Sequence, residues 1–149
     1  MKVHTVVAAL DGSKRTSAVL EAAASAAHTL GATKLVLVRA VAEPSEIPQE
    51  VLAHRMPEIG ELLVKVARED LDGTARAVPA DLLTSVQVRV GPAWKIILEV
   101  AREVDAGLVV LGAHGYSAVE RVLGTTAARV VNHADRSVLV VREPKRHAS

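Results

Sequence analysis

Short apolar runs alternate with longer stretches of helical periodicity along most of the chain. Five of the runs have the length of strands and either a β-branched or an alternating composition. These runs are Val3–Leu10, Leu35–Val41, Ser85–Val90, Leu108–Leu111 and Ser137–Val141. The pattern therefore predicts five strands with helices between them.

Between these runs, apolar residues recur at the i, i+3, i+4, i+7 spacing of an amphipathic helix. The helical stretches cover residues 19–30, 59–71, 92–101 and 125–133. Gly31 lies where a helix C-terminal cap belongs, and Pro92 falls in a first helical turn, where proline is tolerated. Strands separated by helices of about ten or more residues form parallel crossovers, which leave the sheet covered on both faces.

The predicted fold class is therefore α/β, a single-domain, doubly wound (Rossmann-like) five-stranded parallel sheet sandwiched by helices. We expect this domain over residues 1–142 and a flexible C-terminal tail over residues 143–149.

The composition narrows the class of partner. The 149 residues carry a net charge of +1 from 18 basic and 17 acidic side chains, which leaves no basic footprint for nucleic acid or an anionic membrane. No cysteine is present, so disulfides and thiol chemistry are excluded. The N-terminal segment lacks the layout of a signal peptide, and no apolar run approaches the roughly 20 residues of a membrane span. We expect a cytoplasmic protein that binds neither nucleic acid nor membrane.

The strongest chemical signal is the segment LVVLGAHGYSAVERVLGT, between Leu108 and Thr125. A buried strand opens there into Gly112 and Gly115, and Gly124 follows after eight residues, just before a helical stretch. Glycine lets the backbone approach a ligand, successive N–H groups form an anion-binding concavity, and a helix N-terminus adds partial positive charge. The segment therefore predicts phosphate binding.

Two further residues point to the same place in the predicted sheet. In doubly wound sheets, ligands bind beyond the carboxyl ends of the strands, where the strand order reverses. Asp11 follows the first strand, Ala40 lies near the end of the second, and Gly112 ends the fourth. If the first and fourth strands are neighbours, these three residues converge on one site.

These motifs resemble the nucleotide-binding branch of the universal stress protein family. The resemblance rests on the spacing of Gly112, Gly115 and Gly124-Thr125, on the opening VVAALDGS and on LVLVRAV in the second strand, and it covers essentially the whole chain. It implies that the backbone after the second strand contacts adenine, that Asp11 faces the ribose or the phosphates, and that the glycine loop holds the phosphates. The implied binding residues are Ala9, Leu10, Asp11, Ala40, Gly112, His114, Gly115, Gly124, Thr125, Thr126 and Ala127. The implied ligand is ATP or another adenine nucleotide with Mg²⁺, for which Asp11 is the candidate protein ligand.

The chain departs from the commonest family pattern at three places. The spacer between Gly115 and Gly124 is one residue shorter, Arg39 replaces a frequent His beside the implied adenine contact, and Ser137 stands where a Pro usually precedes the final strand. The shorter spacer bears on the shape of the phosphate pocket. The final strand often pairs with another subunit in this family, and here it is apolar and would leave an open edge. We therefore predict a homodimer through Ser137 to Arg142.

Structural roles compete with the implied ligand roles. Thr125 fits a helix N-cap, and Asp11 fits a cap of the first helix or a turn with Gly12. Gly112 and Gly115 fit a simple turn from a strand into a loop. His114 fits a solvated loop histidine, and Trp94 shares helical spacing with apolar neighbours, as expected of a core side chain.

The sequence lacks the machinery of a fast ATPase. It contains no GxxxxGK[ST] motif and no pair of carboxylates spaced to hold Mg²⁺. We therefore predict that binding exceeds turnover, in an ATP-binding stress-response protein that acts as a nucleotide-dependent sensor or regulatory module. The alternatives are a slow ATPase or nucleotidyl-transfer enzyme on the same fold, and a structural dimer that has lost nucleotide binding.

Overall fold

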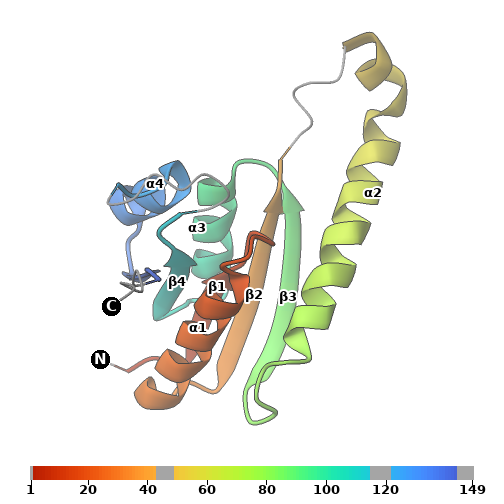
Figure 1. The fold of residues 1–149 in the computed structure, drawn as a ribbon. Helices are drawn as coiled ribbons and strands as arrows, with labels where there is room; N and C mark the ends of the chain where they lie inside the picture. The colour runs from red at the N-terminus through yellow and green to blue at the C-terminus, as the bar shows by residue number, and fades with distance from the viewer. Residues whose placement is uncertain (1, 43–48, 115–121, 144–149) are drawn as a thin grey trace, which may run out of the picture.

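Strands and helices alternate along the chain in the computed structural model, which describes residues 2–42, 49–114 and 122–143 (Figure 1). In chain order the elements are β1 Thr5–Ala9, α1 Thr16–Leu30, β2 Lys34–Val41, α2 Gln49–Ala75, β3 Leu83–Val90, α3 Ala93–Glu103, β4 Leu108–Gly112, α4 Thr125–His133 and β5 Ser137–Val141. Each strand except β5 is followed by a helix, so the helices begin near the carboxyl ends of the strands.

All neighbouring strands pair in parallel, in the order β3-β2-β1-β4-β5. Val7 of β1 pairs with Val36 of β2 on one side and with Val109 of β4 on the other. The chain first extends the sheet from β1 to β3 and then crosses back to place β4 on the other side of β1. This order confirms the predicted doubly wound, five-stranded parallel fold, and it makes the first and fourth strands neighbours.

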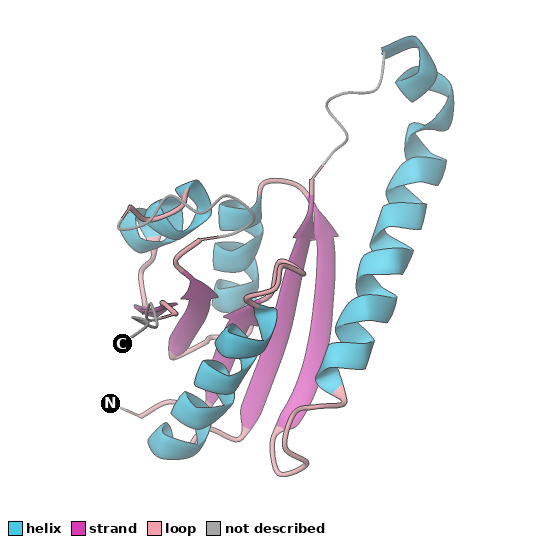
Figure 2. Cartoon of the chain, in the orientation of Figure 1, coloured by secondary structure: helices cyan, strands magenta, loops and turns pink. Residues whose placement is uncertain are grey.

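Helices cover both faces of the sheet (Figure 2). Successive residues of a strand point to opposite faces, so each strand contributes to two cores. Val6 and Ala8 of β1 pack into the core that includes residues of α1 and α2. Val7, which lies between them, packs into the core that includes residues of α3 and α4. The apolar runs that predicted buried strands therefore supply both cores.

The first strand is shorter than its apolar run predicted. Val3 and Leu10 are buried, but the strand itself covers only Thr5–Ala9. Burial thus continues beyond both ends of the strand, so the apolar pattern marks the buried residues rather than the ends of the strand.

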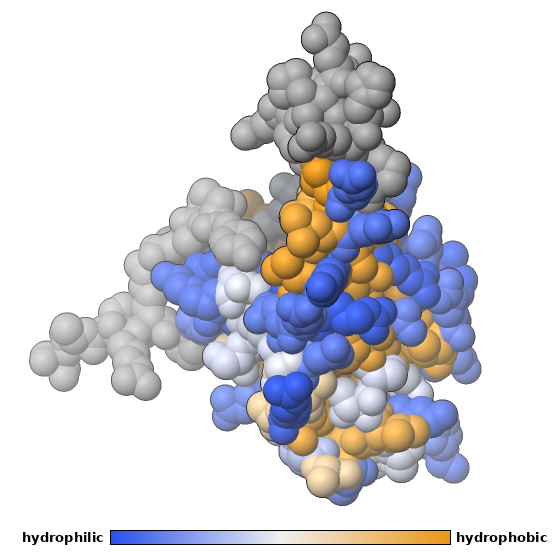
Figure 3. All heavy atoms as spheres, turned by 90° about the vertical axis from the view of Figure 1, so that its right-hand side faces the viewer, coloured by the Kyte–Doolittle hydropathy of each residue, from blue (hydrophilic) through white to orange (hydrophobic). Residues whose placement is uncertain are grey.

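α2 is longer than its apolar stripe predicted, because it begins at Gln49 rather than near Ile59. Its N-terminal turns project beyond the sheet (Figure 1). On the outer side of the helix, Leu62 and Val66 are 59% and 57% exposed, and Figure 3 shows apolar side chains among charged ones on this side of the molecule. Exposed apolar side chains are common on folded proteins and do not by themselves mark an interface.

Several other element boundaries match the prediction. Gly31 ends α1 in the left-handed conformation, with φ 75°, and the bounds of α4 and β5 are the predicted ones. Pro92 is the N-cap of α3 rather than a residue of its first turn.

Among the helices in the described part of the chain, none has both the length and the apolarity that crossing a membrane requires.

Candidate functional site

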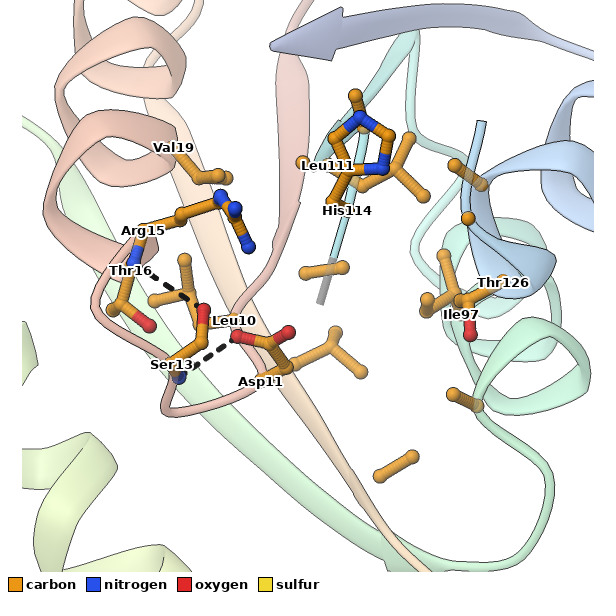
Figure 4. Close-up of a pocket in the computed structure, with 18 of the residues that line it drawn as sticks. Leu10, Asp11, Ser13, Arg15, Thr16, Val19, Ile97, Leu111, His114 and Thr126 are labelled. Carbon is orange, nitrogen blue, oxygen red and sulfur yellow. Dashed lines mark hydrogen bonds between the residues drawn. The ribbon is translucent and has the colours of Figure 1, made fainter. Parts of the chain in front are cut away.

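A cavity of about 350 Å³ opens at the carboxyl end of the sheet, where the sequence predicted a site (Figure 4). Its walls come from β1, β2 and β4, from the turn after β1, and from the first residues of α1, α3 and α4. The volume lies in the range of about 300–1,000 Å³ that is typical of small-molecule sites. The cavity is therefore large enough to hold a ligand of the predicted class.

All the implied binding residues that the structure describes line this cavity. Ala9, Leu10 and Asp11 lie at the end of β1, Ala40 on β2, Gly112 and His114 at the end of β4, and Gly124, Thr125, Thr126 and Ala127 at the start of α4. Gly115 lies outside the described residues. The convergence follows from the strand order, because β1 lies between β2 and β4 and all three strands run in the same direction.

The cavity also contains residues that are not among the implied binding residues. They are Ser13, Arg15, Thr16 and Val19 after β1, Val38 of β2, Ala93 and Ile97 of α3, and Leu111 and Ala113 around the end of β4. Apolar periodicity predicts that a residue is buried, but it does not distinguish burial against another element from burial against a cavity. Ser13 and Arg15 come directly after the turn at Asp11, and this proximity in the sequence could have indicated that they lie at the site.

Local hydrogen bonds fix the loop after β1. The Ser13 N–H donates to Asp11 Oδ1 at 2.9 Å, and the Arg15 N–H donates to Ser13 Oγ at 3.3 Å (Figure 4). Gly12 has φ 79°, in the left-handed region that favours glycine. Asp11 therefore forms the turn with Gly12 that was one of its alternative roles, and the same residue lines the cavity.

Arg39 ties this turn to α2. Its Nε donates to the Leu10 carbonyl oxygen at 3.2 Å, and its Nη2 lies 2.7 Å from Asp70 Oδ2. A Cβ atom at Gly12 would lie 2.7 Å from the same Nη2, so a side chain there would require the end of the Arg39 side chain to shift. Arg39 does not line the cavity. This departure from the family pattern thus supports the loop rather than the wall beside Ala40.

α4 directs its N-terminus at the cavity without a side-chain cap. Gly124 is the N-cap residue, so the alternative that Thr125 is the cap is wrong. The Gly124 N–H donates to the Ala113 carbonyl oxygen at 2.7 Å, and the Ala128 N–H donates to the Gly124 carbonyl oxygen at 2.9 Å. The N–H groups between these two have no helical acceptor, because the first turn of an α-helix leaves them without one. They give this wall of the cavity partial positive charge.

The cavity has an apolar side and a polar side. Val38, Ala40 and Ile97 provide apolar surface between β2 and α3. The turn at Asp11 and the start of α4 provide the polar groups. This division suits a ligand with a flat apolar part and an anionic part. Trp94 does not take part, since it packs against the α3 and α4 core as predicted.

The described residues of this site would not hold a metal ion without a bound nucleotide. Among the described residues, no group of three or more His, Cys, Asp or Glu side chains is placed to hold a metal. Asp11 is the one carboxylate among the described residues of the cavity. Mg²⁺ is often held by one or two carboxylates together with phosphate oxygens and water, so Asp11 fits a cation that arrives with a nucleotide.

Comparison with known proteins identifies the family. The Universal stress protein family model matches residues 2–142. A universal stress protein of Methanocaldococcus jannaschii is 31% identical over 104 residues, which cover 69% of this chain but only 58% of the relative. The structure of the universal stress protein UspA from Lactobacillus plantarum superposes with a TM-score of 0.77 at 25% identity, covering 95% of this chain and 99% of that one.

A universal stress protein solved in complex with cAMP superposes with a TM-score of 0.63 at 27% identity, covering 95% of this chain and 98% of that one. The family model, the sequence relative and the superposed structures agree, and the model spans nearly the whole chain. The chain therefore belongs to the universal stress protein family.

Proposed function

We propose that the chain binds an adenine nucleotide, ATP with Mg²⁺, in the cavity at the carboxyl end of the sheet, and that it acts as a nucleotide-dependent sensor or regulatory module in the stress response. The observation that carries the proposal is the composition of this cavity, which combines apolar surface on β2 with the turn at Asp11 and the uncapped start of α4. The relative solved with cAMP supports the choice of an adenine nucleotide.

The strand order gives the proposed orientation of the ligand. Neighbouring strands lie about 4.8 Å apart, so the step from β2 across β1 to β4 spans roughly 10 Å, about the length of a nucleoside. In this proposal, adenine lies beside Ala40, and the ribose lies over Asp11. The phosphates lie against Gly112, His114 and the first turn of α4, whose N–H groups attract anions.

Two measurements on the purified protein test the proposal. Mass spectrometry of freshly purified, denatured protein should detect a co-purified adenine nucleotide. After removal of any bound nucleotide, calorimetric titration should show tighter binding of Mg-ATP than of Mg-GTP, because guanine has more polar groups to desolvate than adenine on the apolar side of the cavity. Absence of binding to either nucleotide at millimolar concentration would contradict the proposal. A phosphate-release assay on the same sample separates a nucleotide-binding module from a slow ATPase.

Asp11→Ala should weaken ATP binding about threefold to fivefold in Mg²⁺ and less than about twofold in EDTA, since the carboxylate is proposed to face the metal bound to the phosphates. Calorimetric titration in the two buffers measures both losses. Asp81→Ala is the matched control, because Asp81 pairs with His28 and does not line the cavity. Equal losses in Mg²⁺ and in EDTA would instead assign Asp11 to the ribose or to the turn alone.

We also propose that the chain forms a homodimer through β5. This strand lies at an edge of the sheet, and among the described strands it pairs only with β4, so no described strand occupies its other side. Its start is held in place by Arg136, whose Nη1 donates to the carbonyl oxygens of Ala101 at 3.1 Å and Ala106 at 2.8 Å. A firmly held, apolar edge strand favours pairing with its own copy around a two-fold axis.

A further inference from the structure

Arg15 brings a permanent positive charge to the wall of the cavity. Among the described residues that line the cavity, it is the only lysine or arginine. Figure 4 shows its side chain extending from the start of α1 into the space between Asp11 and His114. A guanidinium group has a planar, forked set of donors that matches phosphate oxygens, so its position bears directly on which anion the cavity accepts.

The backbone of Arg15 is held firmly. Its N–H donates to Ser13 Oγ at 3.3 Å, and its carbonyl oxygen accepts from the Val19 N–H at 3.2 Å. Ser13 itself is only 8% exposed, and the Thr16 N–H donates to its carbonyl oxygen at 3.1 Å. The turn that begins at Asp11 therefore sets where the Arg15 side chain starts, and this turn also lines the cavity.

The charge at this position is the reverse of what a helix N-terminus prefers. Arg15 is the N-cap residue of α1 and makes no side-chain capping hydrogen bond. A helix N-terminus carries partial positive charge and is stabilised by acidic side chains, so a cation there is unfavourable for the helix. The first turns of α1, α3 and α4, which all border the cavity, contain no acidic residue. The partial positive charge of these helix starts and the guanidinium of Arg15 both attract an anion in the cavity.

α1 and α4 flank the cavity from opposite faces of the sheet, because their buried residues belong to different cores. Phosphates held by the first turn of α4 would therefore have Arg15 across the cavity from them. A triphosphate carries more negative charge than a monophosphate or a cyclic monophosphate, and Asp11 adds a further negative charge to the cavity. Each additional phosphate thus increases the need for a cation at the position of Arg15.

We infer that Arg15 binds the terminal phosphates of the nucleotide and makes the cavity selective for polyphosphates over monophosphates and cyclic monophosphates. The inference rests on the proposed function for the position of the nucleoside, but the anion site formed by Arg15 and α4 does not depend on adenine. Mono- and cyclic nucleotides then compete weakly with ATP, so occupancy of the cavity reports the phosphorylation state of the nucleotide.

Calorimetric titration of the whole chain with ATP, AMP and inorganic tripolyphosphate tests this inference, with Mg²⁺ present throughout. Arg15→Met should weaken ATP and tripolyphosphate about fivefold while changing AMP less than about twofold. Lys14→Met is the matched control, because it removes the same charge from an exposed neighbour that does not line the cavity, and it should leave all three affinities within about twofold. Arg15→Lys keeps the charge but not the fork, and should recover part of the affinity for ATP.

Equal weakening of ATP and AMP by Arg15→Met would overturn the inference, and so would unchanged binding of ATP. Thermal unfolding of each variant shows whether a loss reflects the fold, and the response of Arg15→Lys decides the case where Arg15→Met is destabilised. A chain that binds tripolyphosphate through Arg15 but shows no preference for adenine nucleotides would support the inference and contradict the proposed function. Binding of ATP that does not depend on Arg15 would support the proposed function and overturn the inference.

Discussion

Gly124→Val should weaken ATP binding at least tenfold while leaving the fold intact, a change of about 1.4 kcal/mol in binding free energy. Gly124 is the N-cap residue of α4 and lines the cavity. A branched side chain there would occupy space that a phosphate needs in order to reach the N–H groups of the first turn. The backbone tolerates the change, because φ at this residue is −59°, which any residue adopts. Calorimetric titration with Mg-ATP measures the loss.

Gly73→Val is the matched control for this substitution. It makes the same chemical change in α2, away from the cavity, at a position where a Cβ atom meets nothing within 4 Å. Its affinity for ATP should equal that of the unmodified chain. Gly124→Ala adds only one methyl group and should give an intermediate loss. A folded Gly124→Val variant with unchanged ATP affinity would remove the start of α4 from the phosphate site.

Val140→Pro should convert the proposed homodimer to a monomer. The Val141 carbonyl oxygen accepts from the Ala113 N–H at 2.9 Å, so Val141 directs its backbone groups toward β4. Backbone groups alternate in direction along a strand, so those of Val140 point away from β4 to the open edge. A proline there removes an edge donor without removing a hydrogen bond between β4 and β5, and edge positions are where strands tolerate proline.

Sedimentation velocity at micromolar concentration distinguishes the homodimer from the monomer. Val140→Thr is the matched control, because threonine keeps the β-branched shape and the backbone N–H, and this variant should remain a dimer. Thermal unfolding should show that the proline variant is folded. The interface on β5 would be wrong if the unmodified chain were monomeric at this concentration, or if the folded Val140→Pro variant still dimerised.

The two halves of the candidate site were predictable to different degrees. The glycine-rich end of β4 and the turn at Asp11 are local features, in which residue type and spacing already indicate the backbone conformation. The apolar wall at Val38 and Ile97 joins a strand and a helix that are distant in the sequence, and periodicity does not indicate which of their buried residues meet at a cavity. Arg15 was missed for a related reason, since its position beside a charged turn is also typical of a solvent-exposed side chain.

Helix ends show the same limit on a smaller scale. Gly31 was predicted to end α1 because the left-handed conformation strongly favours glycine. From residue type alone, Thr125 fitted the N-cap of α4, but the N-cap residue is Gly124. The hydrogen bond from the Gly124 N–H to the Ala113 carbonyl oxygen links the start of α4 to the residue that follows β4. Such a contact across a loop depends on tertiary structure, which local preference does not include.

The sequence by itself determined the alternation of strands and helices, and hence a parallel sheet whose carboxyl ends share one edge. Local spacing is sufficient for this, because each element buries its own apolar face. Only the tertiary structure decided that β1 lies between β2 and β4, which brings Asp11, Ala40 and Gly112 to one cavity. Strand order depends on pairing between segments far apart in the chain. Runs of Val, Leu and Ala are so similar in composition that they do not indicate which strand lies beside which.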